Sequence, residues 1–268
     1  MSIQNPFVHL HCHSEYSLLE ATIRVGNLVK RCKELEMPAV AITDNGSMYG
    51  ALDFYLKAKS EGINPIIGCE MYLTDTIEEK VRSRQRLIVL AKSFSGYQNL
   101  IELVSISHVD GFYYRPRIDL KYLEKLKNDL IVISPGGYGP VASHLRDHND
   151  QAAENIAQSL KSIFGSDFYL GVQKCDLPFE ELINQSTLEL SRKLSIELVG
   201  TNDVYYLHEN QGVLRDVVSC IQKGKTLEGD IQNSFETFHH YFKTSEEMYA
   251  LLEPFPGAYD NTFKIANQ

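Results

Sequence analysis

Three histidines alternate with other residues near the start of the chain, in the stretch FVHLHCHSEYS (7–17). Residues two positions apart in a β-strand lie on one face, so we expect His9, His11 and His13 to point the same way. Neighbours on that face are roughly 6 to 7 Å apart at Cα. Two imidazoles at this spacing can bind one metal ion, or each can bind one of two adjacent ions. The alternative is a hydrogen-bonded polar cluster at a strand end, but burying imidazoles costs desolvation energy, and the paired spacing favours a metal site.

Carboxylate and amide side chains near the ends of other predicted strands are candidates to complete this site. They are Glu20 in the loop after the first strand, Asp44 and Asn45 after the second, Glu70 in the third, and Asn202 and Asp203 in the last. Carboxylates beside imidazoles are typical ligands of zinc or manganese. Each has a simpler explanation when taken alone, because Asp44 could cap a helix and Glu70 could pair with a basic side chain. Their recurrence at several strand ends favours one shared site.

The elements that must position these residues can be read from short apolar runs and longer amphipathic ones. Apolar runs rich in β-branched or aromatic residues predict strands at 7–12, 38–43, 65–73, 87–92, 130–134, 167–173 and 198–206. Apolar residues repeating at steps of three and four predict helices at 22–37, 49–62, 96–109, 120–129, 152–165, 178–195 and 212–224. Thr244 and Glu247 have the spacing of a capping box, which predicts a last helix.

The alternation of strands and helices predicts an α/β fold with a parallel sheet and crossover helices. Seven such units in about 225 residues favour a closed or nearly closed barrel over an open doubly wound sheet. Parallel barrels hold their sites at the carboxyl ends of the strands, where the candidate ligands lie. Residues 225–240 break the alternation and predict a loop-rich appendage. We therefore expect one domain over residues 1–268, with a barrel core at 1–224 and a loop-rich extension at 225–268.

Composition and charge limit the binding partners and the cellular compartment that the sequence favours. The net charge of −9 argues against a main DNA-gripping surface, since such surfaces are basic. The densest cationic run, KVRSRQR (80–86), is interpreted as a solvated loop rather than a binding site. Five cysteines without a CxxC pair predict a reduced, cytoplasmic protein. The sequence shows neither a signal peptide nor an apolar run of membrane-spanning length, so we expect a soluble protein without membrane contact.

Several motifs resemble a known family. HLHCHSEYSLLEA (9–21), PAVAITDNGSMYGALDFY (38–55) and GINPIIGCEMYL (62–73) resemble the PHP (polymerase and histidinol phosphatase) domain. The closer resemblance is to the PHP domains of bacterial DNA polymerase III alpha subunits, and it is carried by LAKSFSGYQNL (90–100), GFYYRPRIDLKYLEK (111–125), TNDVYYL (201–207) and YFKTSEEM (241–248). The resemblance covers almost the whole chain and is weakest at 141–197. It implies a distorted seven-stranded (βα)7 barrel of the PHP type, with a site for up to three metal ions at the carboxyl ends of the strands.

The resemblance also implies which residues bind metal. Matched motif by motif, His11, His13, Glu70 and Asp203 correspond to metal ligands of the family, and Glu20 corresponds to a further acidic ligand. His9 stands where many members have aspartate, so we expect it beside the ligands rather than among them.

Three positions depart from the family pattern. Asn45 stands where metal-binding members have the histidine of Thr-Asp-His, and Tyr205 where they have the histidine of Asp-x-His. The segment SPGGYGP (134–140) stands where polymerase members often carry a cysteine or histidine ligand. His108 is a candidate for one more nitrogen ligand, or a helical residue that faces solvent. The remaining ligands are expected to hold one zinc or manganese ion, or none.

The resemblance implies a domain of a replicative DNA polymerase III alpha subunit, a DNA-directed DNA polymerase. Here it would be a structural and partner-docking module with weak or no 3′–5′ exonuclease or phosphoesterase activity. Its partners would be the palm and thumb of the same subunit, the proofreading exonuclease subunit, and DNA through the full subunit. The magnesium-binding catalytic aspartates would lie in a palm domain beyond residue 268, towards which 225–268 leads. The alternatives are a stand-alone metal-dependent phosphoesterase of histidinol-phosphatase type and a metal-free interaction module.

Overall fold

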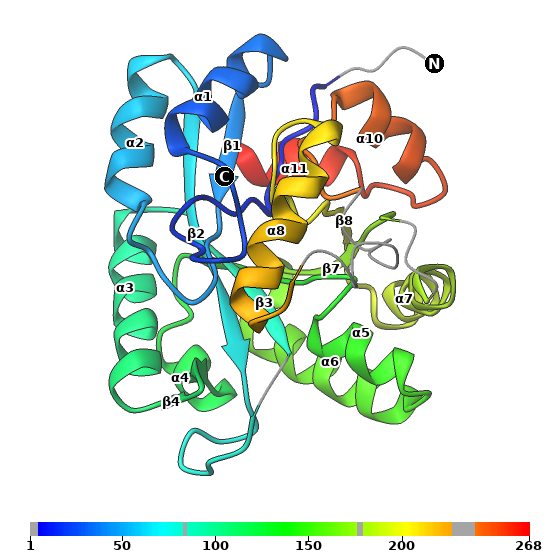
Figure 1. The fold of residues 1–268 in the computed structure, drawn as a ribbon. Helices are drawn as coiled ribbons and strands as arrows, with labels where there is room; N and C mark the ends of the chain where they lie inside the picture. Colours follow the sequence, from blue (N-terminus) through cyan, green and yellow to red (C-terminus); the bar gives the residue numbers. More distant parts are fainter. Residues whose placement is uncertain (1–4, 83–84, 176–178, 227–238) are drawn as a thin grey trace.

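The computed structural model describes residues 5–82, 85–175, 179–226 and 239–268 (Figure 1). Its fold is mixed α/β, with a sheet that curls as a half-barrel and helices packed around it, so the expected α/β fold of the distorted barrel type is confirmed. The strand order is β4-β5-β2-β3-β6-β7-β8, and β1 pairs with β2. The strands are β1 (Ala39–Ile42), β2 (Asn64–Leu73), β3 (Arg86–Ala91), β4 (Phe112–Tyr113), β5 (Arg115–Ile118), β6 (Leu130–Ser134), β7 (Phe168–Val172) and β8 (Leu198–Gly200).

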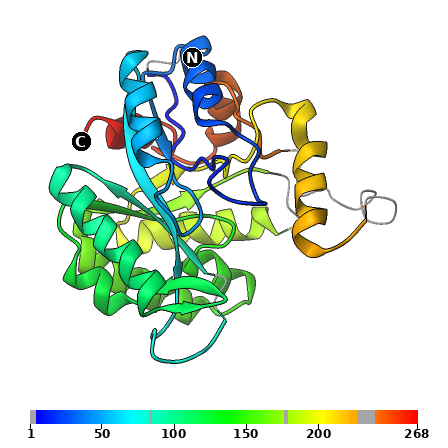
Figure 2. The same ribbon diagram turned by 60° about the vertical axis from the view of Figure 1, so that its left-hand side comes forward.

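The helices follow the predicted order, and α1 and α2 lie side by side (Figure 2). Their bounds are α1 (Val25–Glu34), α2 (Ala51–Ser60), α3 (Phe94–Val109), α4 (Leu120–Lys125), α5 (Pro140–Arg146), α6 (Asp150–Phe164), α7 (Glu180–Leu194), α8 (Gly212–Lys223), α10 (Ser245–Leu252) and α11 (Asp260–Ala266). The sequence did not predict α5, α11 or the short β4–β5 hairpin. Each is seven residues or fewer, which is too short for a clear hydrophobic period.

Two strands run against the others, so the expected all-parallel sheet is wrong at β3 and at the short β4, which is antiparallel to β5. β3 is antiparallel to both of its neighbours, β2 and β6, whereas the pairs β1–β2, β2–β5, β6–β7 and β7–β8 are parallel. A parallel connection needs a crossover of a dozen or more residues, usually a helix. The described part of the β2–β3 connection (74–85) contains no helix. As a result, the first residue of β3 lies beside the carboxyl end of β2.

The predicted first strand, 7–12, is not a regular strand. It forms one isolated bridge, between Cys12 and Val204. The backbone N–H of Ala41, in β1, donates to the carbonyl of His9 at 2.9 Å, and that of Val204 donates to the carbonyl of His11 at 3.0 Å. The segment therefore lies between β1 and the chain that follows β8, with hydrogen bonds to both. The predicted strand at 198–206 is likewise regular only in β8.

Both faces of the sheet are buried, as expected when a sheet is covered on both sides. In β3, Leu87 and Val89 belong to a core cluster that includes side chains of the surrounding helices. Ile88 and Leu90 belong to a second cluster that includes residues from β1, β6, β7 and β8. Glu70 lies directly opposite Ile88 in the β2–β3 pairing, so its side chain shares this second face.

The described part of residues 225–268 contains α10 and α11. Thr244 begins α10 with the predicted capping box: its hydroxyl accepts from the N–H of Glu247, and its own N–H donates to the Glu247 carboxylate at 2.6 Å. The N–H of Gly200, in β8, donates to the carbonyl of Ala258 at 2.7 Å. Most of the predicted loop-rich appendage at 225–240 lies outside the described residues. Among the residues described, no helix is long and apolar enough to cross a membrane.

Candidate metal centre

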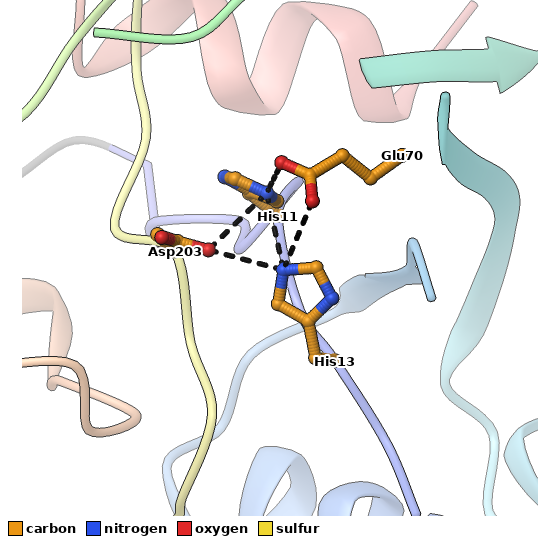
Figure 3. Close-up of side chains that lie close together, drawn as sticks. All are labelled: His11, His13, Glu70 and Asp203. Atoms are coloured by element: carbon orange, nitrogen blue, oxygen red, sulfur yellow. Dashed lines mark hydrogen bonds and ion pairs between the residues drawn. The ribbon is translucent and has the colours of Figure 1, made fainter. Parts of the chain in front are cut away.

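Four buried side chains converge at one end of the sheet: His11, His13, Glu70 and Asp203 (Figure 3). The Nε2 atom of His11 lies 2.9 Å from Oε1 of Glu70 and 3.4 Å from Oδ1 of Asp203. The Nε2 atom of His13 lies 3.0 Å from Oδ1 of Asp203, 3.2 Å from Nε2 of His11 and 3.9 Å from Oε2 of Glu70. Two ligands of a tetrahedral zinc ion with bonds of about 2.0–2.1 Å are roughly 3.4 Å apart. These five distances are close to that value, and all four donor atoms lie within 4.8 Å of one another, so the four side chains are placed to surround one ion.

Three separate parts of the chain bring these ligands together. The two histidines come from the irregular segment between β1 and Val204, and Glu70 comes from β2. Asp203 follows β8 with a positive φ of 48°, in the left-handed region that non-glycine residues seldom adopt. The carbonyl of Asp203 lies 3.0 Å from Nδ1 of His240, which holds the backbone in this conformation. A constrained backbone at a cluster of polar side chains is typical of functional sites.

The far sides of the two imidazoles differ. Nδ1 of His13 lies 3.4 Å from the hydroxyl of Ser17, and that hydroxyl donates to Oδ1 of Asp44 at 2.6 Å. Metal-binding histidines usually have such a partner on the second nitrogen, because it fixes the ring and its tautomer. Nδ1 of His11 is buried and has no hydrogen-bond partner among the described residues. In both rings Nε2 points into the cluster, towards a carboxylate and towards Nε2 of the other ring.

Both carboxylates of the cluster are ionised at neutral pH. Burial would raise the pKa of Glu70, but the Arg86 guanidinium and His11 outweigh it and lower this pKa to about 2. Burial would also raise the pKa of Asp203, but His11 and His13 hold it well below its usual value. Conversely, Asp203 and Glu70 outweigh the burial of His11 and raise its pKa. Two buried anions facing two imidazoles attract a cation, which is the charge balance that a metal site needs.

Asp44 and Glu20 lie near the cluster but outside it. Asp44 accepts from the N–H of Ser14 at 2.6 Å, from the hydroxyl of Ser14 at 2.7 Å and from the hydroxyl of Ser17, so it fixes the loop after the histidines. One oxygen of Glu20 accepts from the amide of Asn45 at 2.6 Å, and the other lies 3.1 Å from Arg115. Both acidic groups are thus engaged by partners other than the four-residue cluster.

The other candidate residues point elsewhere. Nε2 of His9 lies 2.9 Å from the carbonyl of Lys243, and burial lowers the pKa of His9 to about 3, so its ring is neutral. Asn202 donates to the carbonyl of Tyr241 and accepts from Lys243. His108 lies 2.7 Å from the carbonyl of Gly46. The three histidines of FVHLHCHSEYS therefore do not share one environment, because the segment is not a regular strand.

Tyr205 forms one wall of the centre. Its ring stacks on that of His13, with centroids 4.3 Å apart and an angle of 16° between the planes. The guanidinium of Arg215 lies 3.9 Å from the centroid of the same ring. Burial raises the pKa of Tyr205 well above its usual value, so the phenol stays protonated. A protonated phenol is a poor metal ligand, and the role of Tyr205 is to pack and orient the His13 ring.

Sequence analysis missed one residue of the centre, Arg86. One of its terminal nitrogens, Nη1, lies 2.9 Å from Oε2 of Glu70, 3.3 Å from the hydroxyl of Tyr205 and 3.4 Å from Oδ1 of Asn45. Arg86 is the last residue of the KVRSRQR run and the first of β3. Because β3 is antiparallel to β2, this position is diagonal to Glu70 on the same face. The only sequence signal was that the cationic run adjoins an apolar strand.

Known proteins resemble this chain in sequence. The PHP domain family matches residues 9–175. The chain belongs to the PHP domain family. DNA polymerase III subunit alpha of Borreliella burgdorferi is 36% identical over 274 residues, which cover 100% of this chain and 24% of that protein. The subunit of Helicobacter pylori strain 26695 is 36% identical over 283 residues, covering 100% and 23%, and that of Treponema pallidum is 37% identical over 269 residues, covering 98% and 23%. The resemblance to polymerase subunits is therefore confirmed along the whole chain, which spans about a quarter of these relatives.

Solved structures support the same fold. An amidohydrolase from Chromobacterium violaceum superposes with a TM-score of 0.52 at 10% identity, covering 74% of this chain and 87% of that one. At this identity the likeness concerns the fold alone. In this PHP domain, the fold brings together four of the residues that sequence analysis selected as ligands, and places Arg86 next to two of the departures, Asn45 and Tyr205.

Proposed function

We propose that this chain is the PHP domain of a DNA polymerase III alpha subunit, and that it is a structural and docking part of that polymerase. In this proposal residues 1–268 form one domain in the cytoplasm, with one zinc or manganese ion bound by His11, His13, Glu70 and Asp203. The observation that carries the proposal is the match to polymerase relatives over the entire chain at 36% identity. A stand-alone phosphoesterase of histidinol-phosphatase type is not favoured, because the relatives matched over this length are polymerase subunits.

The geometry of the centre supports weak or absent hydrolysis. A divalent ion can lower the pKa of a bound water and polarise a phosphoryl oxygen when it keeps an open coordination position. Catalytic zinc sites therefore use three protein ligands, whereas structural sites use four. Here four side chains converge within 4.8 Å of one another. An ion held by all four has no free tetrahedral position for water, so we assign it to holding three parts of the chain together.

The proposed partners are the rest of the polymerase subunit and its replication assembly. The chain spans about a quarter of its polymerase relatives, so the palm and thumb of the same subunit would be its nearest neighbours. The proofreading exonuclease subunit is a further proposed partner. DNA would be contacted through the full subunit rather than by this domain, since the chain carries a net charge of −9. Polymerisation would depend on magnesium bound by palm aspartates outside this chain.

A nuclease assay tests the proposed lack of catalysis. The purified protein, loaded in turn with zinc and with manganese, is incubated with a 3′-labelled oligonucleotide and with bis-p-nitrophenyl phosphate. We expect rates that do not differ from those of the His11→Ala variant prepared in parallel. Metal-dependent hydrolysis that is at least tenfold faster in the wild type, and that both His11→Ala and Asp203→Ala abolish, would contradict the proposal and favour a phosphoesterase.

Ser17 offers a test of how the centre is positioned. Ser17→Ala removes the hydroxyl that connects His13 to Asp44. Loss of such a supporting partner typically weakens metal binding by about 10- to 100-fold. We expect this loss of affinity in a competition titration against a chromophoric chelator, with an unchanged stoichiometry. An affinity equal to that of the wild type would show that Ser17 does not orient the His13 ring.

A further inference from the structure

Glu70 divides its two carboxylate oxygens between different neighbours. Oε1 lies 2.9 Å from Nε2 of His11, inside the four-residue cluster. Oε2 lies 2.9 Å from Nη1 of Arg86, on the other side of the carboxylate. Glu70 thus lies between the place of an ion held by the four-residue cluster and the guanidinium of Arg86. In a two-metal centre the two ions are about 3.5–4 Å apart, and a second ion beside Oε2 would occupy the place of the guanidinium. The position on the Oε2 side is here filled by a guanidinium.

The surroundings of Nη1 are those of a cation site. Besides Oε2 of Glu70, Nη1 faces the hydroxyl oxygen of Tyr205 at 3.3 Å and the amide oxygen of Asn45 at 3.4 Å. One nitrogen thus has three oxygen neighbours supplied by three different parts of the chain. The side chain of Arg86 is only 18% exposed, so solvent provides little of this coordination. A guanidinium keeps its charge at every physiological pH, and the cation at this position is therefore permanent.

We propose that Arg86 takes the place of a second metal ion and limits this centre to one. This inference rests on the proposed single-ion site. It gives the reason why that site binds one ion and not two. The guanidinium neutralises the outer oxygen of Glu70, which a second ion would need as a ligand. It also places a positive charge where that ion would sit, so a divalent cation there meets repulsion rather than attraction. Arg115 engages Glu20 in a similar way, at 3.1 Å, and reduces the supply of free anionic ligands nearby.

The decisive comparison is between two variants that differ only at residue 86. Asn45→His/Tyr205→His places an imidazole at each position that now faces Nη1, and keeps Arg86. Asn45→His/Tyr205→His/Arg86→Ala adds the removal of the guanidinium. Both proteins and the wild type are dialysed against zinc or manganese, and metal per chain is measured by mass spectrometry of the intact protein and by elemental analysis. We expect one ion in the wild type, one in the double variant and two in the triple variant.

Electron paramagnetic resonance of the manganese forms gives a second measurement. Two adjacent manganese ions couple magnetically, so the triple variant should lose the six-line signal of an isolated ion that the wild type and the double variant retain. Arg86→Lys, which keeps a cation, should also bind one ion. Circular dichroism establishes which variants are folded, and the spectra are compared among those.

The outcomes separate this inference from the proposed function. A wild type that binds no ion overturns the single-ion site, and this inference with it. One ion in the wild type and one in the folded triple variant overturns the inference alone. Two ions in the double variant, with Arg86 present, also overturns it. If the triple variant does not fold, Asn45→His/Tyr205→His/Arg86→Met, which keeps the apolar part of the side chain at residue 86, provides the test: a second equivalent of metal supports the inference, and a stoichiometry of one overturns it.

Discussion

Adding zinc or manganese to the metal-free protein should raise its melting temperature by roughly 10 °C, once the free ion exceeds its dissociation constant by about 1,000-fold. At that excess a ligand specific to the folded state contributes about 4 kcal/mol. Each kcal/mol corresponds to about 2–4 °C in a domain of this size. The four ligands come from residues 11–13, 70 and 203, so the unfolded chain does not offer the site. The measurement is a thermal melt followed by circular dichroism, with chelator as the metal-free reference.

Two histidine variants give the matched comparison for this experiment. His11→Ala removes a ligand of the cluster and should abolish the rise in melting temperature. His108→Ala removes a histidine that lies against the Gly46 carbonyl, outside the cluster, and should leave the rise unchanged. A wild-type melting temperature that responds to neither metal would contradict the one-ion site and favour the metal-free interaction module. An equal response in His11→Ala would mean that the metal binds elsewhere.

The sequence predicted the regular core of the fold well. The strands β1, β2, β3, β6 and β7 each begin and end within two residues of their predicted bounds. These strands are continuous apolar runs, and a run buried on both faces leaves a strong signal in a single sequence. Strand ends that meet at one edge of a sheet predicted a shared site, and the family resemblance selected Glu70 and Asp203 as the ligands that join His11 and His13. Such a prediction does not require the register between paired strands to be known.

The N-terminal segment shows where local pattern was insufficient. Alternation in FVHLHCHSEYS predicted a strand with three histidines on one face. Instead, the segment has one backbone hydrogen bond with β1 on one side and two with Val204 on the other. The directions of its side chains are therefore set by their packing contacts and do not alternate with a period of two. Consequently His11 and His13 meet Glu70 and Asp203, whereas His9 lies against Phe242 and the Lys243 carbonyl. Only the expectation from family resemblance separated His9 from the other two.

The position of Arg86 could not be read from its neighbours in sequence. A strand of the same composition can run parallel or antiparallel, since direction depends on the pairing partners and on the length of the connection. With β3 antiparallel, the cationic end of KVRSRQR meets the carboxyl end of β2. Had β3 been parallel, Arg86 would lie at the opposite end of the sheet. One change of strand direction thus converts a residue interpreted as solvated into the partner of Glu70.

The contact between Glu70 and Arg86 leads to the largest expected loss of stability. In the presence of chelator, Glu70→Gln should lower the free energy of unfolding by about 3–5 kcal/mol, because it removes a buried anion and leaves the largely covered guanidinium of Arg86 without its partner. Glu70 is 2% exposed and Arg86 18%, so water replaces little of the lost interaction. Chemical denaturation with urea measures the loss, and the chelator excludes any contribution from metal.

The control is a pair of the same type on the surface. Glu197 and Lys264 form an ion pair in which both side chains are 50% exposed. Glu197→Gln should cost about 0.2–1 kcal/mol, as is typical of exposed pairs. In a double-mutant cycle, adding Arg86→Gln to Glu70→Gln should recover part of the loss, because the unpaired charge is removed with its partner. Equal costs for Glu70→Gln and Glu197→Gln, with no recovery in the double variant, would show that the guanidinium does not depend on Glu70. Arg86 would then not be the cation that neutralises Glu70, and the limit of one metal ion would need another cause.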